Sequence, residues 1–537
     1  MSLDTVLRYH EATKHDFGRF ARSVGYLDWA SQPDPFRRYQ GAELVELPRS
    51  AGPRGPAALS RESIGDFLRC SMGLSAWKEY GRSRWSLRVN PSSGNLHPTE
   101  AYIVWDGRVC HYAPKEHGLE VRSRLETTID TTASAFLVAL TSIHWREAWK
   151  YGERAFRYCQ HDAGHALCAL RVAASLFGWR LTLLPRWSDE QIATVLGLDR
   201  DADHERAERE DADCIAVVTT GDPTGWLDMD PSPLVDAARA ARWFGTANRL
   251  STSHVDWPII DAVADATKFR PGLNSEIGPG LISANPRGPE ITEIRPGLNF
   301  EPLYERAITL QRRSATAFNG GYALRRDTFL RMLARLQPGA PPWDAIDWPP
   351  HVHLATFVHR VDGLTSGVYA YLRDPDVLDQ WKRAMRPEFL WEQAEPGVPL
   401  YLLVPIDCRR MANRVSCDQD IAEDGFFSLG MIARFESALR ERGPSFYRRL
   451  FWECGLIGQV LYLEAEVATS RATGIGCFYD NPVHELLGLS GHEWQSLYHF
   501  SMGIPIEDSR LTTEPGYPWE GSGLSPGLQA SGSGPES

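Results

Sequence analysis

The chain has 537 residues, with 57 basic and 69 acidic side chains and a formal net charge of −12. That length exceeds what a single hydrophobic core usually supports, so we expect two or three domains. The acidic balance argues against nucleic acid or an anionic membrane as a partner, and no apolar run is long enough to span a bilayer.

In chain order, composition divides the sequence into five segments. They are an N-terminal extension with one polar helix and a proline-rich stretch (1–60), a first mixed helix-and-strand unit (61–225), a connector rich in Pro, Gly and Asn (226–300), a second mixed unit (301–515) and a disordered tail (516–537). The connector repeats RPGLN at 270–274 and 295–299 and is expected to carry a helix near 235–244. The charged N-terminus predicts no signal peptide, and nine cysteines without a CxxC pair indicate reduced thiols and a cytoplasmic location.

The two mixed units contain an internal repeat. A shift of 291 residues aligns Gly164 with Gly455 and the segment 195–198 with 486–489, without a gap over about forty residues. Each copy has the pattern of one long helix rich in small residues, a short loop and a second amphipathic helix ending at glycine. We therefore predict two copies of one fold, packed as an intramolecular pseudo-dimer, in which a site at the interface could lose one of its two copies.

The first chemical motif is the turn PSSGN at 91–95, which leads into the strand-like run AYIVW at 101–105. Its hydroxyls, carboxamide and backbone N–H groups could bind the edge of a planar heterocycle such as the pyrimidine of a flavin. The alternative is an ordinary polar loop before a strand. The candidate ligands are Pro91, Ser92, Ser93 and Asn95.

Three motifs of the second unit complete the pattern. The pair Arg312-Arg313 with Ser314 suits a phosphate, or is a solvated charged turn. The segment ATGIGCF at 472–478, with Ile475 and Gly476 at its centre, allows the backbone to approach a flat ligand, or caps a helix. Arg510 is a second phosphate ligand or a surface arginine.

Together these motifs resemble the nitroreductase superfamily of FMN enzymes, and most closely the SagB-type dehydrogenases, which include flavoproteins that oxidise azolines to azoles in ribosomal peptides. The resemblance covers about 61–225 and 305–515. It implies an α+β fold of two tandem domains, each a mixed, mainly antiparallel sheet flanked by helices. It also implies that FMN lies between the units, with the PSSGN turn supplied by one unit and the arginines and glycine loop by the other.

The opposite combination of motifs is incomplete, which predicts one FMN per chain. The 291-residue shift places Pro185, which has no N–H, at the position of Gly476. Alignment of the last strands places Asp228 where Arg510 stands, and a carboxylate there would repel phosphate. The residues before the strand His353–Val358 lack the Ser-Ser-Gly-Asn turn.

Lys150 and Tyr151 are the catalytic candidates, because they resemble a Lys-Tyr pair given a catalytic role in azoline oxidases. A lysine acts as a base near neutral pH only when burial or nearby positive charge lowers its pKa, and Arg154 and Arg157 could supply such charge. The alternative is that Lys150 pairs at the start of a helix.

No metal site is predicted. His161 and His165 have a metal-like spacing on a helix, but no third ligand is apparent in the sequence. Cys477 lies inside the glycine loop, and no second cysteine is near it in the sequence, so a redox role is not predicted.

Three functions remain open. The first is a dehydrogenase that transfers hydride between FMN and a small or peptide-derived heterocycle. The second is a reductase of nitro, quinone or enone compounds that takes its electrons from NAD(P)H. The third is a non-catalytic flavin-binding or scaffold subunit of a peptide-modifying complex. Flavin content separates the third from the others, and NAD(P)H oxidation separates the second from the first.

Overall fold

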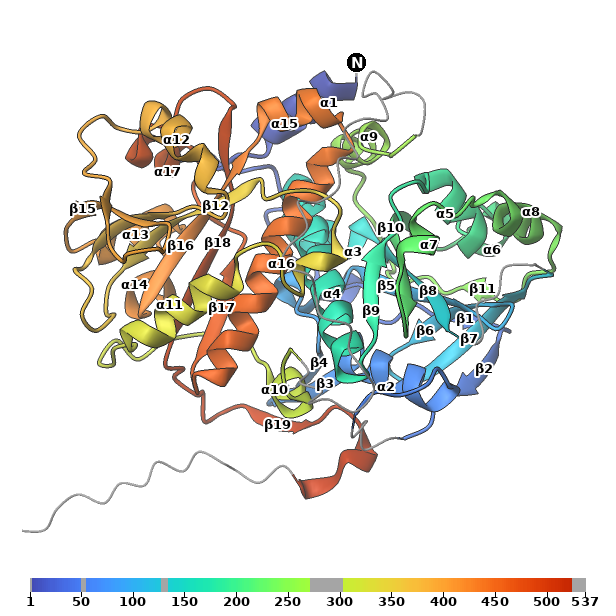
Figure 1. Ribbon diagram of the computed structural model, residues 1–537. Helices are drawn as coiled ribbons and strands as arrows, with labels where there is room; N and C mark the ends of the chain where they lie inside the picture. Colours follow the sequence, from blue (N-terminus) through green and yellow to red (C-terminus); the bar gives the residue numbers. More distant parts are fainter. Residues whose placement is uncertain (1, 50–54, 127–133, 271–302, 524–537) are drawn as a thin grey trace, which may run out of the picture.

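Two seven-stranded sheets lie on either side of a pair of long helices (Figure 1). The structure is a computed structural model that describes residues 2–49, 55–126, 134–270 and 303–523. Apart from Arg270, both RPGLN repeats lie outside these residues. The α+β class predicted from the sequence is confirmed, and the sheets are antiparallel throughout rather than mixed.

The strand order of the two sheets is the same except for the strand at one edge. In the first it is β2 (Glu43–Glu46), β7 (Gly118–Arg124), β6 (Arg108–Ala113), β5 (Thr99–Trp105), β8 (Ala135–Ser142), β10 (Asp211–Thr219) and β9 (Arg180–Leu183). In the second it is β14 (Glu392–Gln393), β15 (Leu400–Pro405), β13 (Gly367–Tyr371), β12 (Val352–Val358), β16 (Phe427–Arg434), β18 (Trp494–Gly503) and β17 (Arg471–Ile475). Central strands such as β8 and β12 are buried along their whole length, as their continuous apolar runs predict.

The long helices of the two copies cross at their matched glycines. Helices α4 (Ala155–Leu176) and α16 (Phe446–Val467) each have 22 residues and are separated by the predicted shift of 291. A Cβ atom on Gly164 would lie 2.3 Å from the carbonyl oxygen of Trp452, and one on Gly455 would lie 2.4 Å from that of His161. Glycine at both positions therefore lets the two backbones touch, which confirms the predicted pseudo-dimer contact.

We expect Gly455→Ala to destabilise the chain by about 1–3 kcal/mol, because the added methyl group would overlap backbone atoms of α4 that cannot move independently. Urea unfolding followed by circular dichroism measures the change. Gly221→Ala is the matched control: its Cβ would meet no atom within 4 Å, so its effect should stay within about 0.5 kcal/mol. Equal stability of the two variants would contradict the close helix crossing.

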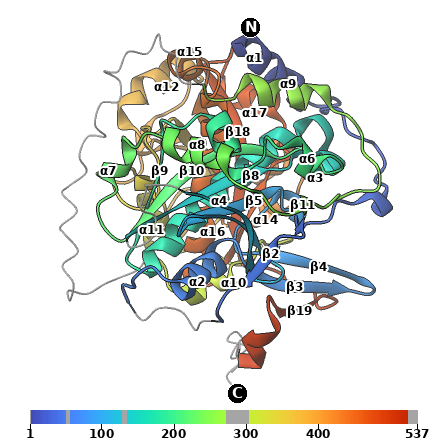
Figure 2. The ribbon, with the colours of Figure 1, turned by 90° about the vertical axis from the view of Figure 1, so that its right-hand side faces the viewer.

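Segments expected to flank the two units join the folded structure. Strand β2 lies in the N-terminal stretch and pairs with β7. The connector carries α8 (Ser232–Ala240), close to the predicted helix, and also α9 (Pro258–Ala266). At the end of the second unit, β19 (Thr512–Pro515) crosses to the first copy and pairs with β3 (Leu74–Tyr80), which in turn pairs with β4 (Ser83–Arg88) (Figure 2).

Residues 516–523, which were expected to belong to a disordered tail, are part of the folded structure. Tyr517 is buried, packs against Phe36 and Leu74, and donates its hydroxyl to the carbonyl of Pro114 (2.6 Å). This aromatic anchor orders the short helix Pro518–Gly523, whereas the expected tail from residue 524 lies outside the described residues. Among the described helices, none is long and apolar enough to cross a membrane.

Candidate functional site

A cavity of about 390 Å³ is lined by residues of both copies. This volume lies within the range of about 300–1,000 Å³ that is usual for small-molecule sites. The cavity brings together nine of the ten predicted cofactor ligands: Pro91, Ser92, Ser93 and Asn95 from the first copy, and Arg312, Arg313, Ser314, Ile475 and Gly476 from the second.

The PSSGN turn is fixed in place by its own hydroxyls. Gly94 and Asn95 adopt positive φ angles of 62° and 57°, which bends the chain sharply before β5. The hydroxyl of Ser92 accepts the backbone N–H of His97 (3.0 Å), and the backbone N–H of Ser93 donates to Asp162 on α4 (3.1 Å). The two serine side chains therefore hold the turn, while the carboxamide of Asn95 makes no hydrogen bond within the described residues and lines the cavity.

On the opposite wall, Arg312 and Arg313 follow α10 (Arg306–Gln311). Arg312 donates to the carbonyl oxygens of Arg88 (3.0 Å) and Val89 (3.1 Å), and its guanidinium lies 5.0 Å from the ring centroid of Tyr462. Its Nη1 is buried without a hydrogen-bond partner among the described residues. Arg313 donates to the carbonyl of Ser75 (2.7 Å). Within the described chain neither guanidinium forms an ion pair, and the hydrogen bonds of both go to backbone carbonyl oxygens.

The pKa values of both arginines are lowered. Burial lowers the pKa of Arg312, and burial together with the neighbouring Arg312 lowers the pKa of Arg313 to about 9. Glu466, which accepts the backbone N–H of Arg313 (3.0 Å), opposes the shift only in part. Lys78 on β3 lines the same end of the cavity, and burial lowers its pKa as well. A bound anion would stabilise all three cations, and phosphate matches the fork of a guanidinium.

The glycine loop, which begins within β17 and continues beyond its end, allows close approach to a ligand. A Cβ on Gly476 would lie 2.1 Å from the ring of Tyr158, so any side chain there would fill the space beside that ring. The backbone N–H of Gly474 donates to the hydroxyl of Tyr462 (2.9 Å), which also hydrogen bonds to Ser314 (2.9 Å). The loop, Ser314 and the arginine wall are thus connected through one tyrosine.

Lys150 and Tyr151 end helix α3 (His144–Tyr151) beside the PSSGN turn. A Cβ on Gly94 would lie 2.7 Å from the hydroxyl of Tyr151 and 3.2 Å from Nζ of Lys150, so both polar groups meet the turn. Tyr151 lines the cavity, and burial, reinforced by Glu147, raises its pKa well above the usual value. Its hydroxyl is therefore protonated at neutral pH and can donate a hydrogen bond.

The two arginines expected to act on Lys150 are engaged elsewhere. Arg154 and Arg157 form buried ion pairs with the two carboxylate oxygens of Asp480, at 2.8 and 2.9 Å. Their charge therefore stabilises the contact between the N-terminus of α4 and helix α17 (Asp480–Leu487). This corrects the expectation that they supply positive charge for Lys150.

A buried carboxyl pair at the same end of the cavity was not predicted. Burial raises the pKa of Glu147 and of Asp162, and proximity to Asp162 raises that of Glu147 further. Neither carboxylate oxygen of Glu147 has a hydrogen-bond partner within the described residues. The raised pKa values favour a protonated form of the pair. An acidic residue in the middle of the apolar helix α4 was the available sequence signal for Asp162.

Arg510, the tenth predicted ligand, does not line the cavity. Its side chain is 70% exposed, pairs with Asp508 at 2.7 Å, and lies 5.4 Å from the ring of Tyr80. Because the chain after β18 turns along the β3–β4 hairpin to form β19, Arg510 points along the outside of that hairpin. The structure places Lys78 at the cavity instead.

A second site, formed by the turn region of the second copy and the glycine-loop and late-arginine positions of the first, would have almost no free volume. A cavity of only about 30 Å³ is lined there by Pro185, Trp187, Arg449 and Trp452, among others. Asp228 is exposed and pairs with Arg186. A larger cavity of about 640 Å³ is lined by more acidic than basic side chains, including Asp189, Glu210 and Asp265, which would repel phosphate. The composite cavity is therefore the candidate for an anionic ligand.

His161 and His165 are structural. Both are buried in the helix crossing, where His161 hydrogen bonds to the carbonyl of Leu497 (3.0 Å) and His165 to Gln459 and the hydroxyl of Tyr498 (both 3.3 Å). These contacts join the first copy to the second.

Comparison with solved structures identifies the fold. A protein from Anabaena variabilis classed as a nitroreductase matches with a TM-score of 0.67 and 20% identity over 94% of this chain and 99% of that one. Two further matches are too weak to carry an argument. A second such protein from Ralstonia eutropha has a TM-score of 0.26 and 15% identity over 37% of this chain and 82% of that one. The E. coli microcin synthetase McbBCD complex has a TM-score of 0.27 and 17% identity over 40% of this chain and 77% of that one. No family model and no curated protein matches the sequence. On the first likeness, which spans both halves, the chain has the nitroreductase fold, present in two copies.

Proposed function

We propose that the chain is an FMN-dependent oxidoreductase, similar to SagB-type dehydrogenases, that transfers hydride between one bound FMN and a small or peptide-derived heterocycle. The observation that carries the proposal is the pair of buried Arg312 and half-buried Arg313, two cations without an ion-pair partner within the described residues, in a cavity shared by both copies. A phosphate there would also satisfy the orphaned Nη1 of Arg312.

The residues present fit the rest of FMN. The arginines, Ser314 and Lys78 would hold the phosphate, and the PSSGN turn and the glycine loop would hold the flat ring between the two copies. Asn95 offers an unpaired carboxamide for the polar edge of the ring. When bound, FMN would supply the hydride-transfer chemistry that no amino-acid side chain provides.

The chain's own residues would manage protons. The Tyr151 hydroxyl, held protonated by burial, would donate a hydrogen bond to substrate, and Lys150 beside it would accept the substrate proton. The Glu147–Asp162 pair, whose raised pKa values favour a bound proton, lies near Tyr151 and would act as a proton store. We place the enzyme in the cytoplasm, because all nine cysteines are free thiols.

We expect the purified protein to be yellow, with close to one FMN per chain. Added FMN at about 100 times its Kd should stabilise flavin-free protein against unfolding by about 2.7 kcal/mol. Absorbance, flavin release and thermal unfolding measure these effects. Turnover of azoline compounds with FMN supports the dehydrogenase, whereas NAD(P)H oxidation with a nitro or quinone acceptor identifies the reductase. A colourless protein that gains no stability from FMN would refute both and leave the scaffold function.

A further inference from the structure

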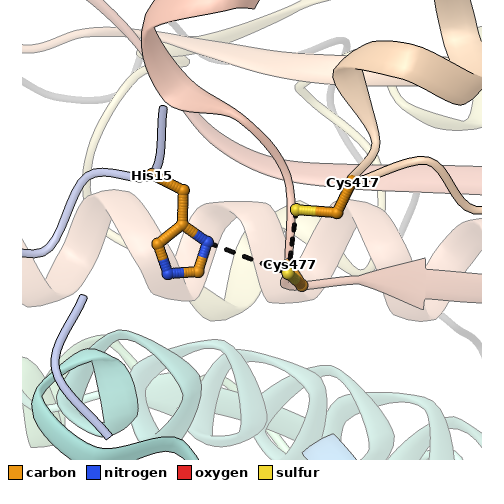
Figure 3. Close-up of side chains that lie close together, drawn as sticks. All are labelled: His15, Cys417 and Cys477. Atoms are coloured by element: carbon orange, nitrogen blue, oxygen red, sulfur yellow. Dashed lines mark hydrogen bonds between the residues drawn. The ribbon is translucent and has the colours of Figure 1, made fainter. Parts of the chain in front are cut away.

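Two cysteines distant in sequence meet beside the candidate FMN cavity. Cys477 is in the glycine loop and lines the cavity, and Cys417 follows helix α13 (Arg409–Val415). Their sulfur atoms lie 2.9 Å apart as free thiols, and Nδ1 of His15 lies 3.8 Å from Sγ of Cys477 (Figure 3). The expectation that Cys477 has no cysteine near it is therefore wrong, because the fold brings Cys417 from sixty residues upstream.

The surroundings favour a thiolate on Cys477. The contact with Cys417, with smaller contributions from His15 and Arg154, lowers the pKa of Cys477 to about 5 against the opposing effect of burial. The pKa of Cys417 is raised by the same contact, so Cys417 remains a thiol that donates to the thiolate. Both side chains are half-buried and accessible to small reagents.

The backbone holds the two sulfurs together. Cys417 and Asp418 have positive φ angles of 55° and 54°, a conformation that non-glycine residues rarely adopt, and it turns the Cys417 side chain toward the glycine loop. The side chain of Gln419 donates to the carbonyl oxygens of Ser416 (2.8 Å) and Cys477 (2.9 Å). The segment carrying Cys417 is thus tied directly to the segment carrying Cys477.

The same three side chains could hold a metal ion, but the geometry favours thiol chemistry. Two thiolates bound to one tetrahedral zinc, each at about 2.3 Å, would lie about 3.8 Å apart. The observed separation is shorter, 2.9 Å. The guanidinium of Arg154, which donates to the carbonyl of Gly476 (3.2 Å), also places positive charge next to the site and disfavours a cation.

We propose that Cys417 and Cys477 are a redox-active thiol pair that delivers two electrons to FMN in the adjacent cavity, so that the chain can draw electrons from low-molecular-weight thiols. The inference rests on the proposed function, since it needs bound FMN. When the sulfur–sulfur bond forms, the Cys477 thiolate and the Cys417 thiol release two electrons and one proton, and oxidised flavin takes up all three. Two molecules of an external thiol then reduce the protein disulfide, form their own disulfide and return one proton to water.

The test uses anaerobic FMN-loaded protein mixed with excess reduced glutathione, with loss of flavin absorbance followed over time. Cys417→Ala and Cys477→Ala should each slow this loss at least about tenfold relative to the native chain, because neither variant can form the disulfide. Cys110→Ala, in a buried cysteine of β6 remote from the cavity lining, is the matched control and should behave as the native chain.

Two readouts are independent of flavin reduction. Peptide mapping by mass spectrometry should find a Cys417–Cys477 disulfide in the native protein without added thiol. Alkylation of Cys477 by iodoacetamide should persist down to a pH of about 5, and Cys417→Ala should move its midpoint upward, toward the ordinary thiol value.

The possible outcomes distinguish a failure of the thiol-pair inference from a failure of the proposed FMN-dependent function. Native-like flavin reduction in both cysteine variants, with FMN content unchanged, would overturn the thiol pair and leave the proposed function intact. Retention of one zinc ion per chain, with both thiols protected from alkylation, would overturn it in favour of a metal site. A native protein that binds no FMN would refute the proposed function and, with it, the electron transfer.

Discussion

Replacing both Arg312 and Arg313 by glutamine is expected to lower FMN affinity at least about 100-fold. Each buried guanidinium would make a charge-assisted hydrogen bond to the phosphate, and such bonds contribute about 1.5–3 kcal/mol each. The effect should be specific to the phosphate, because the PSSGN turn and the glycine segment that we assign to the ring keep their residues in this variant. Fluorescence titration with FMN and with riboflavin, which lacks the phosphate, measures the difference.

Riboflavin also controls for structural damage, because Arg312 supports the carbonyl oxygens of Arg88 and Val89. If the double variant loses FMN and riboflavin affinity equally, the arginines shape the cavity and do not bind phosphate. Arg510→Gln is the matched arginine control. Its side chain is 70% exposed and lies outside the cavity, so we expect FMN affinity to change less than about twofold, within the ±0.5 kcal/mol of a surface substitution.

The structure confirms the internal repeat that the sequence predicts, and it does so most clearly in the two long helices that pack against each other. Helices α4 and α16 keep equal length and a constant shift because they cross each other at Gly164 and Gly455, so an insertion in either would move every contact. The same shift relates α5 (Asp189–Leu196) to α17. It also relates β9 to β17, but it fails for the earlier strands, since among the described residues only the first copy has the β3–β4 hairpin before its central strand β5.

The same alignment contained a clue to the site that sequence reasoning missed. It pairs Asp162 with Glu453, so both long helices carry a buried acid at the same position. Asp162 accepts the backbone N–H of Ser93 before β5, and Glu453 accepts those of His351 and Val352 at the start of β12. Each acid therefore fixes the chain that enters a central strand. In the first copy that chain is the PSSGN turn.

Lys78, Cys417 and the misplaced Arg510 show which features local patterns cannot predict. Lys78 reaches the cavity only because β3 pairs with β19 from the opposite end of the chain. Cys417 meets Cys477 only through a turn with two positive φ angles, for which its sequence has no glycine. Arg510 lies in the loop between β18 and β19, so its position depends on where β19 pairs. Because β19 pairs with β3, which is far away in the sequence, local patterns could not predict that position.

Lys150→Met and Tyr151→Phe are each expected to lower kcat at least about 100-fold while FMN content stays near that of the native chain. Positioned acid–base groups contribute about 10²–10⁴-fold to rate, and both side chains meet the turn that we assign to the flavin ring. Steady-state turnover of an azoline substrate, beside the FMN-to-protein ratio, measures the effect. Tyr26→Phe, at an exposed tyrosine, is the matched control and should leave both values unchanged.

The two variants also distinguish which group removes the substrate proton. If Lys150 is the base, Lys150→Met loses turnover at every pH, and the Glu147–Asp162 pair only stores the proton. If the carboxyl pair is the base, it must first ionise. Burial raises both carboxyl pKa values, so ionisation is favoured as pH rises. Turnover of Lys150→Met would then recover at alkaline pH, and Glu147→Gln would abolish that recovery. Retained turnover in both Lys150→Met and Tyr151→Phe at neutral pH would exclude Lys150 and Tyr151 from the chemistry. Their role would then be limited to supporting the PSSGN turn.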